Sequence, residues 1–420
     1  MRLSGFRVER EGGRVRAAAE MVWEDCARDP ATLFFEVDEA HGEGMVANPH
    51  AFLLAAAVPA LRFGERRIWV DAAVCPVLLE GLDSALSIIS SWYYRKQGLP
   101  PVIEVASRRS ALLRGRVVRA GSFFSGGIDS YATVRLNMLV YPEDHPYRLR
   151  EGVLAFGLEQ DDPRKFEHVS SALRDAAAEL RLTLTTVSTN VYLLYREEDA
   201  RDHFQFWYRA FEGSALAAIA HSLAHRFSSM SISGTISPRT LVPFGSHPML
   251  DPSYSSSDLR IHHAGAGLTR LEKTALITEW GGVAPRHLRV CNQYRRYEAS
   301  ALNCGECGKC LMTKLAFVAL GHAAALDAFA SKDLSVSLLR RKVRLEDVHD
   351  LDVYSELVAP LAERGYGDAA RWLARMVRMY QWFGPDAGWR RLPERAAKRA
   401  RRWLGATQAG TRRVKHSVRA

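Results

Sequence analysis

The sequence predicts an α/β protein built on a parallel sheet with helices on both faces. Between residues 115 and 260, short β-branched runs alternate with segments of helical periodicity, the pattern typical of such a sheet. One of these runs breaks into the glycine turn Ser125, Gly126 and Gly127 and then restarts as a helix. Four of the six cysteines lie within 20 residues, at positions 291–310. These observations place the predicted chemistry in the middle of the chain.

The composition is that of an ordinary globular protein. The chain has 420 residues, of which 47% are hydrophobic and 25% charged, and this length favours two or three domains. Charged residues follow the first methionine, so no signal peptide is predicted. The longest apolar run, residues 51–61, is far shorter than the roughly 20 residues that span a bilayer. We therefore expect a cytoplasmic protein without a membrane span.

Residues 1–114 are expected to form a small α+β domain. Residues 32–37 and 67–71 have the pattern of strands, and residues 51–61 and 77–93 that of helices. No catalytic or metal-binding pattern occurs there. The high apolar content favours a module that packs on the rest of the chain, or a contact in a homo-oligomer.

Residues 115–320 carry the alternation of strands and helices. Strands are expected at residues 115–124, 152–158, 182–188, 230–235 and from 259. Helices are expected at residues 130–139, 165–181 and 211–227. Because ligands bind beyond the carboxyl ends of parallel strands, the glycine turn and Gly234 are expected at the binding edge.

The glycine turn has the features of an anion site. Two residues without a Cβ permit unusual backbone angles and the close approach of a ligand, and Asp129 and Ser130 stand where helix caps occur. Free amides at the helix start, with the helix dipole, favour a phosphate. The P-loop pattern Gly-x-x-x-x-Gly-Lys-Ser/Thr is absent. A purely structural glycine turn is the alternative.

The segment Ser125-Gly-Gly-Ile-Asp-Ser130 resembles the Ser-Gly-Gly-x-Asp-Ser loop of the N-type ATP pyrophosphatases, also called the PP-loop family. The resemblance implies an adenine nucleotide alpha hydrolase-like fold and an enzyme that cleaves ATP between the α and β phosphates. It implies that Ser125, Gly126, Gly127 and Ser130 cradle the pyrophosphate, while Asp129 orients the loop or Mg²⁺. Ser125, Asp129 and Ser130 are then the catalytic candidates. Further nucleotide contacts are expected from Phe156, Gly234 and Arg270.

The cysteine cluster consists of Cys291, Cys304, Cys307 and Cys310. In a reducing compartment such a cluster indicates a metal rather than disulfides. Short gaps that contain glycine let the last three thiolates converge, and Cys291 would complete a tetrahedral, structural Zn²⁺ site. An iron–sulfur cluster and redox-active thiols are the alternatives.

The cysteine segment resembles one branch of this family in particular. Residues 303–317 resemble the zinc segment of the 7-cyano-7-deazaguanine synthase branch, where the zinc is structural and the segment helps to wall the active site. The 12 residues between Cys291 and Cys304 form a longer spacing than that branch has. Residues 267–272 resemble its Gly-Leu-Thr/Ser-Lys-x-Glu segment, with Arg270 in the place of the lysine. Arginine has a planar, forked guanidinium and lysine a compact ammonium, so Arg270 would contact a phosphate differently from the lysine of that branch.

Three further residues are candidates for substrate contact. Arg209 opens a segment that resembles the arginine-led helix start of the same branch, and would face ATP phosphates or an acidic substrate; the alternative is an exposed helix arginine. His247 and Asp251 lie in a long polar loop at residues 244–258, where lids and binding loops occur, although the sequence favours ordinary turn residues there. His262 and His263 are expected to be ordinary core or surface residues.

The remaining chain divides into a helical region, residues 321–389, and a basic tail, residues 390–420. Residues 343–384 carry an aromatic stripe, Trp372, Leu373, Met376, Tyr380 and Trp382, for which core packing is expected. The tail holds 11 Lys and Arg against one Glu, so it accounts for the whole net charge of +10. Nucleic acid or an anionic surface would suit it, and a solvated terminus is the alternative.

These patterns and the resemblance together predict an ATP-dependent, AMP-forming ligase or amidotransferase. A carboxylate or carbonyl oxygen of a small acid would be adenylated, and free ammonia or an amine would then give an amide or nitrile. One alternative is an RNA- or tRNA-modifying enzyme that thiolates or amidates its substrate. The other is a nucleotide-binding module without catalytic activity.

Overall fold

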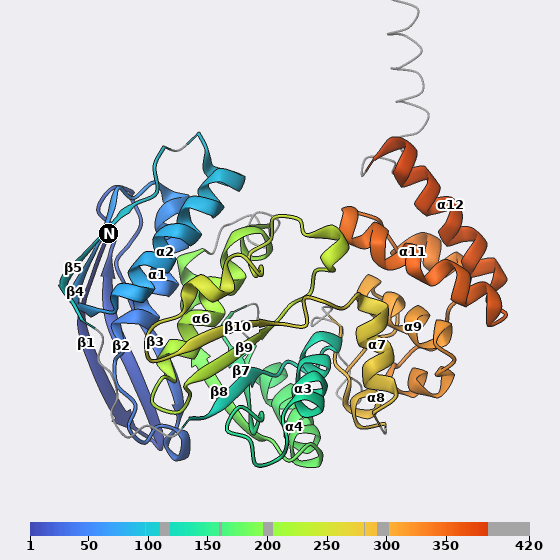
Figure 1. The fold of residues 1–420 in the computed structure, drawn as a ribbon, viewed down its shortest axis with the longest axis horizontal. Helices are drawn as coiled ribbons and strands as arrows, with labels where there is room; N and C mark the ends of the chain where they lie inside the picture. Colours follow the sequence, from blue (N-terminus) through green and yellow to red (C-terminus); the bar gives the residue numbers. More distant parts are fainter. Residues whose placement is uncertain are drawn as a thin grey trace, which may run out of the picture.

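The computed structural model describes residues 1–96, 98–109, 118–158, 162–195, 205–280, 282–291 and 302–384. It confirms the α/β class: ten strands form one sheet in the order β10-β9-β6-β7-β8-β3-β2-β1-β4-β5 (Figure 1). The strands are β1 (Arg2–Glu11), β2 (Arg14–Val22), β3 (Ala31–Asp38), β4 (Arg67–Val74), β5 (Val102–Arg108), β6 (Ala120–Phe123), β7 (Glu151–Phe156), β8 (Thr183–Thr189), β9 (Ser229–Ser233) and β10 (Arg260–Ala264).

Six of the nine strand pairings are parallel, and five strands, β10, β9, β6, β7 and β8, run in one direction side by side. The chain passes from β6 through β7 to β8 on one side of β6, and then places β9 and β10 on its other side. This reversal makes a topological switch point between the carboxyl ends of β6 and β9, where open α/β sheets bind ligands. The glycine turn follows β6, and Gly234 follows β9.

Helices cover both faces of this parallel half. Val153 packs into the core formed with α1 (Pro49–Phe63), α2 (Pro76–Ile89) and α6 (Glu212–Ser222), and its neighbour Leu154 packs into the core formed with α3 (Ile128–Val140) and α4 (Pro163–Glu179). Successive side chains of a strand point to opposite faces, so the two cores lie on opposite sides of the sheet. Figure 1 shows α3 and α4 apart from α1, α2 and α6.

The N-terminal strands continue the same sheet. Antiparallel β3 pairs with β8, with Phe35 opposite Thr189. Leu33, Phe35 and Val37 are buried under α1, whereas Arg14 and Glu36 form an ion pair on the outer face, the alternation of a sheet covered on one side. The boundary expected at residue 114 lies outside the described residues. The strands on its two sides nevertheless belong to one sheet and share one core.

The helices after β10 pack into the second core, to the right in Figure 1. They are α7 (Arg270–Thr278), α8 (Val283–His287), α9 (Gly308–Ala319), η8 (Ala323–Ala328), α10 (Val336–Lys342), α11 (Val348–Glu363) and α12 (Gly367–Phe383). Of the expected aromatic stripe, Trp372, Leu373, Met376 and Tyr380 are buried as predicted, while Trp382 is exposed. The basic tail, residues 390–420, lies outside the described residues.

Short helical turns complete the described chain. They are η1 (Glu39–His41), η2 (Ser90–Tyr94), η3 (Val191–Leu194), η4 (Trp207–Phe211), η5 (Pro238–Thr240) and η6 (Asp251–Tyr254), of which η2 and η4 are π-helical. The helix expected at residues 77–93 is α2 followed by η2, and the one expected at residues 211–227 is α6, which ends earlier, at Ser222. Among the described helices, none is long and apolar enough to cross a membrane.

Candidate functional site

The turn after β6 requires glycine at its centre. Gly126 has φ +75°, and a Cβ on it would lie 2.5 Å from Cδ2 of Leu173 in α4. Its carbonyl accepts a hydrogen bond from the backbone N–H of Arg289 at 2.8 Å. Ser125 is exposed beside it. Leu173 and Arg289 thus hold the backbone of the turn in place, and the Ser125 side chain is exposed to solvent.

Helix α3 begins immediately after the turn, with an open amino end. Its N-cap residue is Gly127, which has no side chain to accept from the first helical amides. The Ser130 hydroxyl donates to the Gly127 carbonyl at 2.9 Å and does not cap those amides. The uncapped amides and the positive end of the helix dipole make this end suited to an anion, as the sequence predicts.

Asp129 joins the turn to helix α7. Its carboxylate oxygens accept from Arg270 Nη1 at 2.5 Å and from Lys273 Nζ at 3.3 Å. Helix α7 starts with a capping box between Thr269 and Glu272, so Arg270 lies in its first turn. Residues three apart share one helix face, and Lys273 therefore points toward the same carboxylate.

The three charged groups are enclosed together. Burial alone would raise the pKa of Asp129, but the charges of Arg270 and Lys273 outweigh it and hold the pKa below its usual value. Burial lowers the pKa of Lys273, and Asp129 opposes that shift. The exposed fractions of the side chains, 17% for Asp129, 13% for Arg270 and 1% for Lys273, show that only the lysine is fully shielded from water.

Lys273, which the sequence marks only as a lysine near Arg270, is not among the predicted site residues. Its ammonium also donates to the carbonyl of Gly234, beyond the end of β9. Lys273 therefore links the loops after β6 and β9 across the switch point. Its spacing of three from Arg270 was the available signal. Seven of the predicted residues, Ser125, Gly126, Gly127, Asp129, Ser130, Gly234 and Arg270, are brought together in this way.

Phe156 occupies the end of β7, the strand next to β6. Its ring packs on Phe166 of α4, with the ring centroids 4.9 Å apart. It is partly exposed. The structure thus places Phe156 at the same edge of the sheet as the glycine turn.

Asp251 organises a second cluster on the far side of Gly234. The side chain is fully buried, and it accepts from the Ser246 hydroxyl at 2.8 Å, from the His247 backbone N–H at 3.3 Å and from His263 Nδ1 at 2.7 Å. The His247 ring lies against Trp92, with centroids 5.2 Å apart, and burial lowers the pKa of this histidine. Asp251 is therefore the buried acceptor at the centre of this cluster. His263, expected to be an ordinary core or surface residue, is one of its donors.

Arg209 is exposed on η4. The carbonyl of the adjacent Tyr208 accepts from the Gly245 backbone N–H at 2.6 Å, and Tyr93 of η2 donates to the Pro243 carbonyl at 2.6 Å. The two π-helical turns therefore both lie near the 243–251 loop. π-Helical turns are rare and occur frequently at functional sites. Among the described residues, Arg209 forms no hydrogen bond or ion pair with His247 or Asp251.

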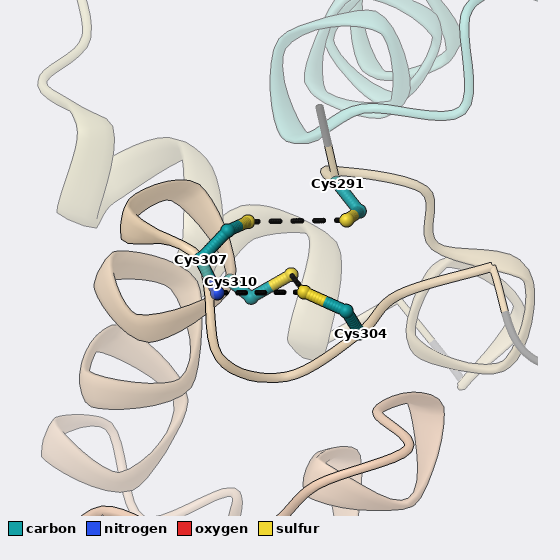
Figure 2. Close-up of side chains that lie close together, drawn as sticks. All are labelled: Cys291, Cys304, Cys307 and Cys310. Atoms are coloured by element: carbon teal, nitrogen blue, oxygen red, sulfur yellow. Dashed lines mark hydrogen bonds between the residues drawn. The ribbon is translucent and has the colours of Figure 1, made fainter. Parts of the chain in front are cut away.

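The four cysteines converge on one point (Figure 2). Their sulfur atoms all lie within 4.8 Å of one another, with 3.8 Å between Cys291 and Cys307 and 3.9 Å between Cys304 and Cys310. In a tetrahedral zinc site with bonds of about 2.3 Å, neighbouring sulfurs lie about 3.8 Å apart. None of the four forms a disulfide. The prediction that this group is able to hold a metal is confirmed.

The local backbone explains why the thiols meet. Gly305 has φ +78°, and a Cβ on it would lie 2.1 Å from the Ser331 carbonyl oxygen, so the turn after Cys304 needs glycine. The Cys304 sulfur accepts from the backbone N–H groups of Glu306 and Cys307, each at 3.4 Å. Cys307 is the N-cap of α9, and Cys310 lies in its first turn, where the dipole favours thiolates.

A buried asparagine fixes the remaining ligand. Asn303 accepts from the N–H groups of Val290 and Cys291 and donates to the carbonyls of Leu288 and Ala328. These bonds hold Cys291 beside the other three thiols. The bonds to Leu288 and Val290 also fix Arg289, which lies between them. The backbone N–H of Arg289 is thereby held against the carbonyl of Gly126. The cysteine segment is thus joined directly to the turn after β6.

The donor set fits Zn²⁺. The contact with Cys291 raises the pKa of Cys307 to about 11, and Cys291 and Cys307 together raise that of Cys310. Cys307 and Cys310 therefore resist ionisation unless a cation neutralises them, and soft thiolates select Zn²⁺ or an iron–sulfur cluster. The closed four-ligand arrangement is that of a structural site.

Comparisons with known proteins add no assignment: no family model matches the chain, and neither the curated proteins nor the solved structures contain a match. The arrangement of the site itself therefore carries the functional conclusion.

Proposed function

We propose that the chain is an ATP-dependent, AMP-forming ligase of the N-type ATP pyrophosphatase type, similar to the 7-cyano-7-deazaguanine synthase branch. One observation carries the proposal. A Ser-Gly-Gly turn with an uncapped helix behind it stands at the switch point of a parallel sheet, opposite the cations Arg270 and Lys273. Few arrangements other than a phosphate site need both features together.

The ATP phosphates would lie at the amino end of α3, between Ser125 and the α7 cations. A substrate carboxylate oxygen would attack the α-phosphorus, and pyrophosphate would leave with its charge stabilised by Arg270 and Lys273. The enzyme would mainly position groups and stabilise charge. Ammonia or an amine would then attack the acyl-adenylate and release AMP. A second ATP-dependent round on the resulting amide would give a nitrile.

Two metals are expected with this function. Cys291, Cys304, Cys307 and Cys310 would hold a structural Zn²⁺, and its role would be to fix Arg289 under the glycine turn. For Mg²⁺ the described residues offer a poorer fit, because both oxygens of Asp129 already accept from cations. Asp129 therefore suits the orientation of the loop and of the α7 cations.

The acid substrate would lie beside the nucleotide, toward η4 and the 243–251 loop. Arg209 is exposed there and offers a guanidinium for a carboxylate. Asp251 is engaged by His263 and by the backbone N–H of His247, and His247 Nδ1 accepts from the Met249 N–H, so both residues would shape this side of the site.

The experiment is a pyrophosphate-release assay with pooled acids and amines, read by mass spectrometry for AMP and for new amide or nitrile products. We expect release that depends on one acid and that Ser125→Ala reduces at least about tenfold, the typical cost of a lost transition-state contact. Ser84→Ala, an exposed serine on α2, is the matched control. ATP binding without AMP formation under any combination would instead indicate the nucleotide-binding module.

The basic tail supports a second candidate, an RNA- or tRNA-modifying enzyme of the same type. Its 11 basic residues against one acid would bind phosphates in a salt-dependent way. Removal of residues 390–420 should then abolish RNA binding. A shortened chain that binds RNA as well as the full chain would contradict this candidate.

A further inference from the structure

The Asp251–His263 pair is built into the fold rather than placed on its surface. The side chains are 0% and 3% exposed, and they meet at 2.7 Å. Nδ1 of His263 faces Asp251, and Nε2 is the second ring nitrogen. That atom is buried and has no hydrogen-bond partner among the described residues. A buried polar atom without a partner calls for an explanation.

Two glycines make room for the pair. A Cβ on Gly213 would lie 2.3 Å from Oδ1 of Asp251, and a Cβ on Gly234 would lie 2.4 Å from Nε2 of His263. Neither glycine has a positive φ, so the space and not the backbone conformation excludes a side chain. Nε2 of His263 therefore takes up the space that a side chain at position 234 would need.

Gly234 is held on its other sides as well. Its N–H donates to the Ala264 carbonyl at 2.8 Å, and its own carbonyl accepts from Lys273 Nζ. His263 reaches Gly234 from one face of the sheet, since its strand neighbour Ile261 packs in the core with α6, and Lys273 reaches it from α7, whose Ile277 packs in the other core. His263 and Lys273 thus approach the same glycine from opposite sides.

We propose that His263, oriented by Asp251, is a positioning residue that sets the place of the Lys273 ammonium through the backbone of Gly234. The ring fixes the plane of the Gly234 peptide, the carbonyl of that peptide fixes Lys273, and Lys273 reaches Asp129 at 3.3 Å. The role of this lysine at a phosphate rests on the proposed function. The coupling between the two residues does not.

The coupling is tested by a double-mutant cycle of His263→Ala and Lys273→Met, with chemical unfolding as the readout. If Gly234 transmits the effect, the double variant should depart from the product of the single effects by about tenfold in the unfolding constant. The matched control is His262→Ala, the exposed neighbour on β10, which should combine with Lys273→Met within about twofold. Independent effects at His263 and Lys273 would overturn the proposal.

A second cycle tests the contact itself. Gly234→Ala should destabilise the chain, because its methyl group would meet the imidazole. In a His263→Ala background the ring is gone, so most of that loss should disappear. An equal loss in both backgrounds would show that His263 does not fix Gly234.

ATP affinity, measured by calorimetry, separates positioning from a merely structural role. His263→Gln places an amide near the position of Nε2 and should retain most of the affinity, whereas His263→Asn keeps the Asp251 bond but leaves Gly234 unsupported and should weaken it about tenfold. Equal affinities in wild type and both variants would refute positioning. A wild-type chain that binds no ATP would refute the proposed function, while the first cycle would still decide the coupling.

Discussion

Asp129→Asn is the change that tests the electrostatics of the site most sharply. The carboxylate is the counter-ion of both Arg270 and Lys273, and the lysine is 1% exposed. The amide would leave two enclosed cations next to each other. Breaking a buried ion pair by removing one partner costs about 3–5 kcal/mol. Because Asp129 and Arg270 retain some exposure to water, we expect about 3 kcal/mol.

The loss should depend on pH in a defined direction. The cations hold the folded-state pKa of Asp129 below its usual value, which is about 3.9 for an unfolded chain. The carboxylate therefore stabilises the fold fully above that unfolded value, and this contribution disappears as the pH falls through the folded-state pKa. The difference between wild type and Asp129→Asn should be largest at neutral pH and should shrink below about pH 4.

Urea unfolding at pH 7 and along an acid series measures this difference. The control is Asp368→Asn, which removes the acid of an exposed pair with Arg371 and should leave the free energy of unfolding nearly unchanged. An Asp129→Asn chain as stable as wild type at pH 7 would refute the electrostatic reasoning. So would a loss that stays constant into the acid range.

Three further changes have defined outcomes. Gly126→Ala should lower the free energy of unfolding by about 2 kcal/mol or more, because the positive φ and the contact with Leu173 both oppose a methyl group. Adding Leu173→Ala should relieve only the part of this loss that comes from the contact. Urea unfolding of the single and double variants measures both effects. Cys304→Ser should abolish bound zinc, measured by elemental analysis, whereas the distant Cys75→Ser should not. Burial raises the pKa of Asp350 to about 7, so its ionisation destabilises the fold as the pH rises from about 4 to 7. Asp350→Asn should therefore be more stable than wild type at pH 8, by at most about 4 kcal/mol. Equal stability of the two chains at pH 8 would contradict this.

The sequence predicts the parallel half of the sheet well because each element there has its own local signal. The strands at β6, β7, β8 and β9 are short β-branched runs next to periodic helices, and the glycine turn marks where a ligand approaches. The cysteine site was predictable for a similar reason, since two-residue gaps with glycine bring thiols together locally.

The N-terminal strands have burial and pairing that local sequence patterns do not predict. Strand β1 reads as a charged segment because its outer face is exposed, and its pattern of burial becomes visible only when β2 and β4 pair with it. The pairing of β3 with β8 joins residues more than 150 positions apart. Such a contact has no signature in a single sequence.

The same limit applies to the second cluster. His263 lies at the end of a strand and Asp251 at the start of η6, and only the return of the loop brings them within 2.7 Å. Their polar side chains are predictable as turn or surface residues from the sequence. The two glycines that make room for them, Gly213 and Gly234, are far apart along the chain, so their shared purpose emerges in three dimensions.

The central claim is that the turn after β6 holds the phosphates of ATP. A crystal structure of the full chain with an ATP analogue that has a methylene group between the α and β phosphates would test this directly. We predict phosphate density at the amino end of α3, within hydrogen-bond distance of Ser125 and the α7 cations. A nucleotide bound elsewhere, with this turn closed by its own side chains, would contradict the account.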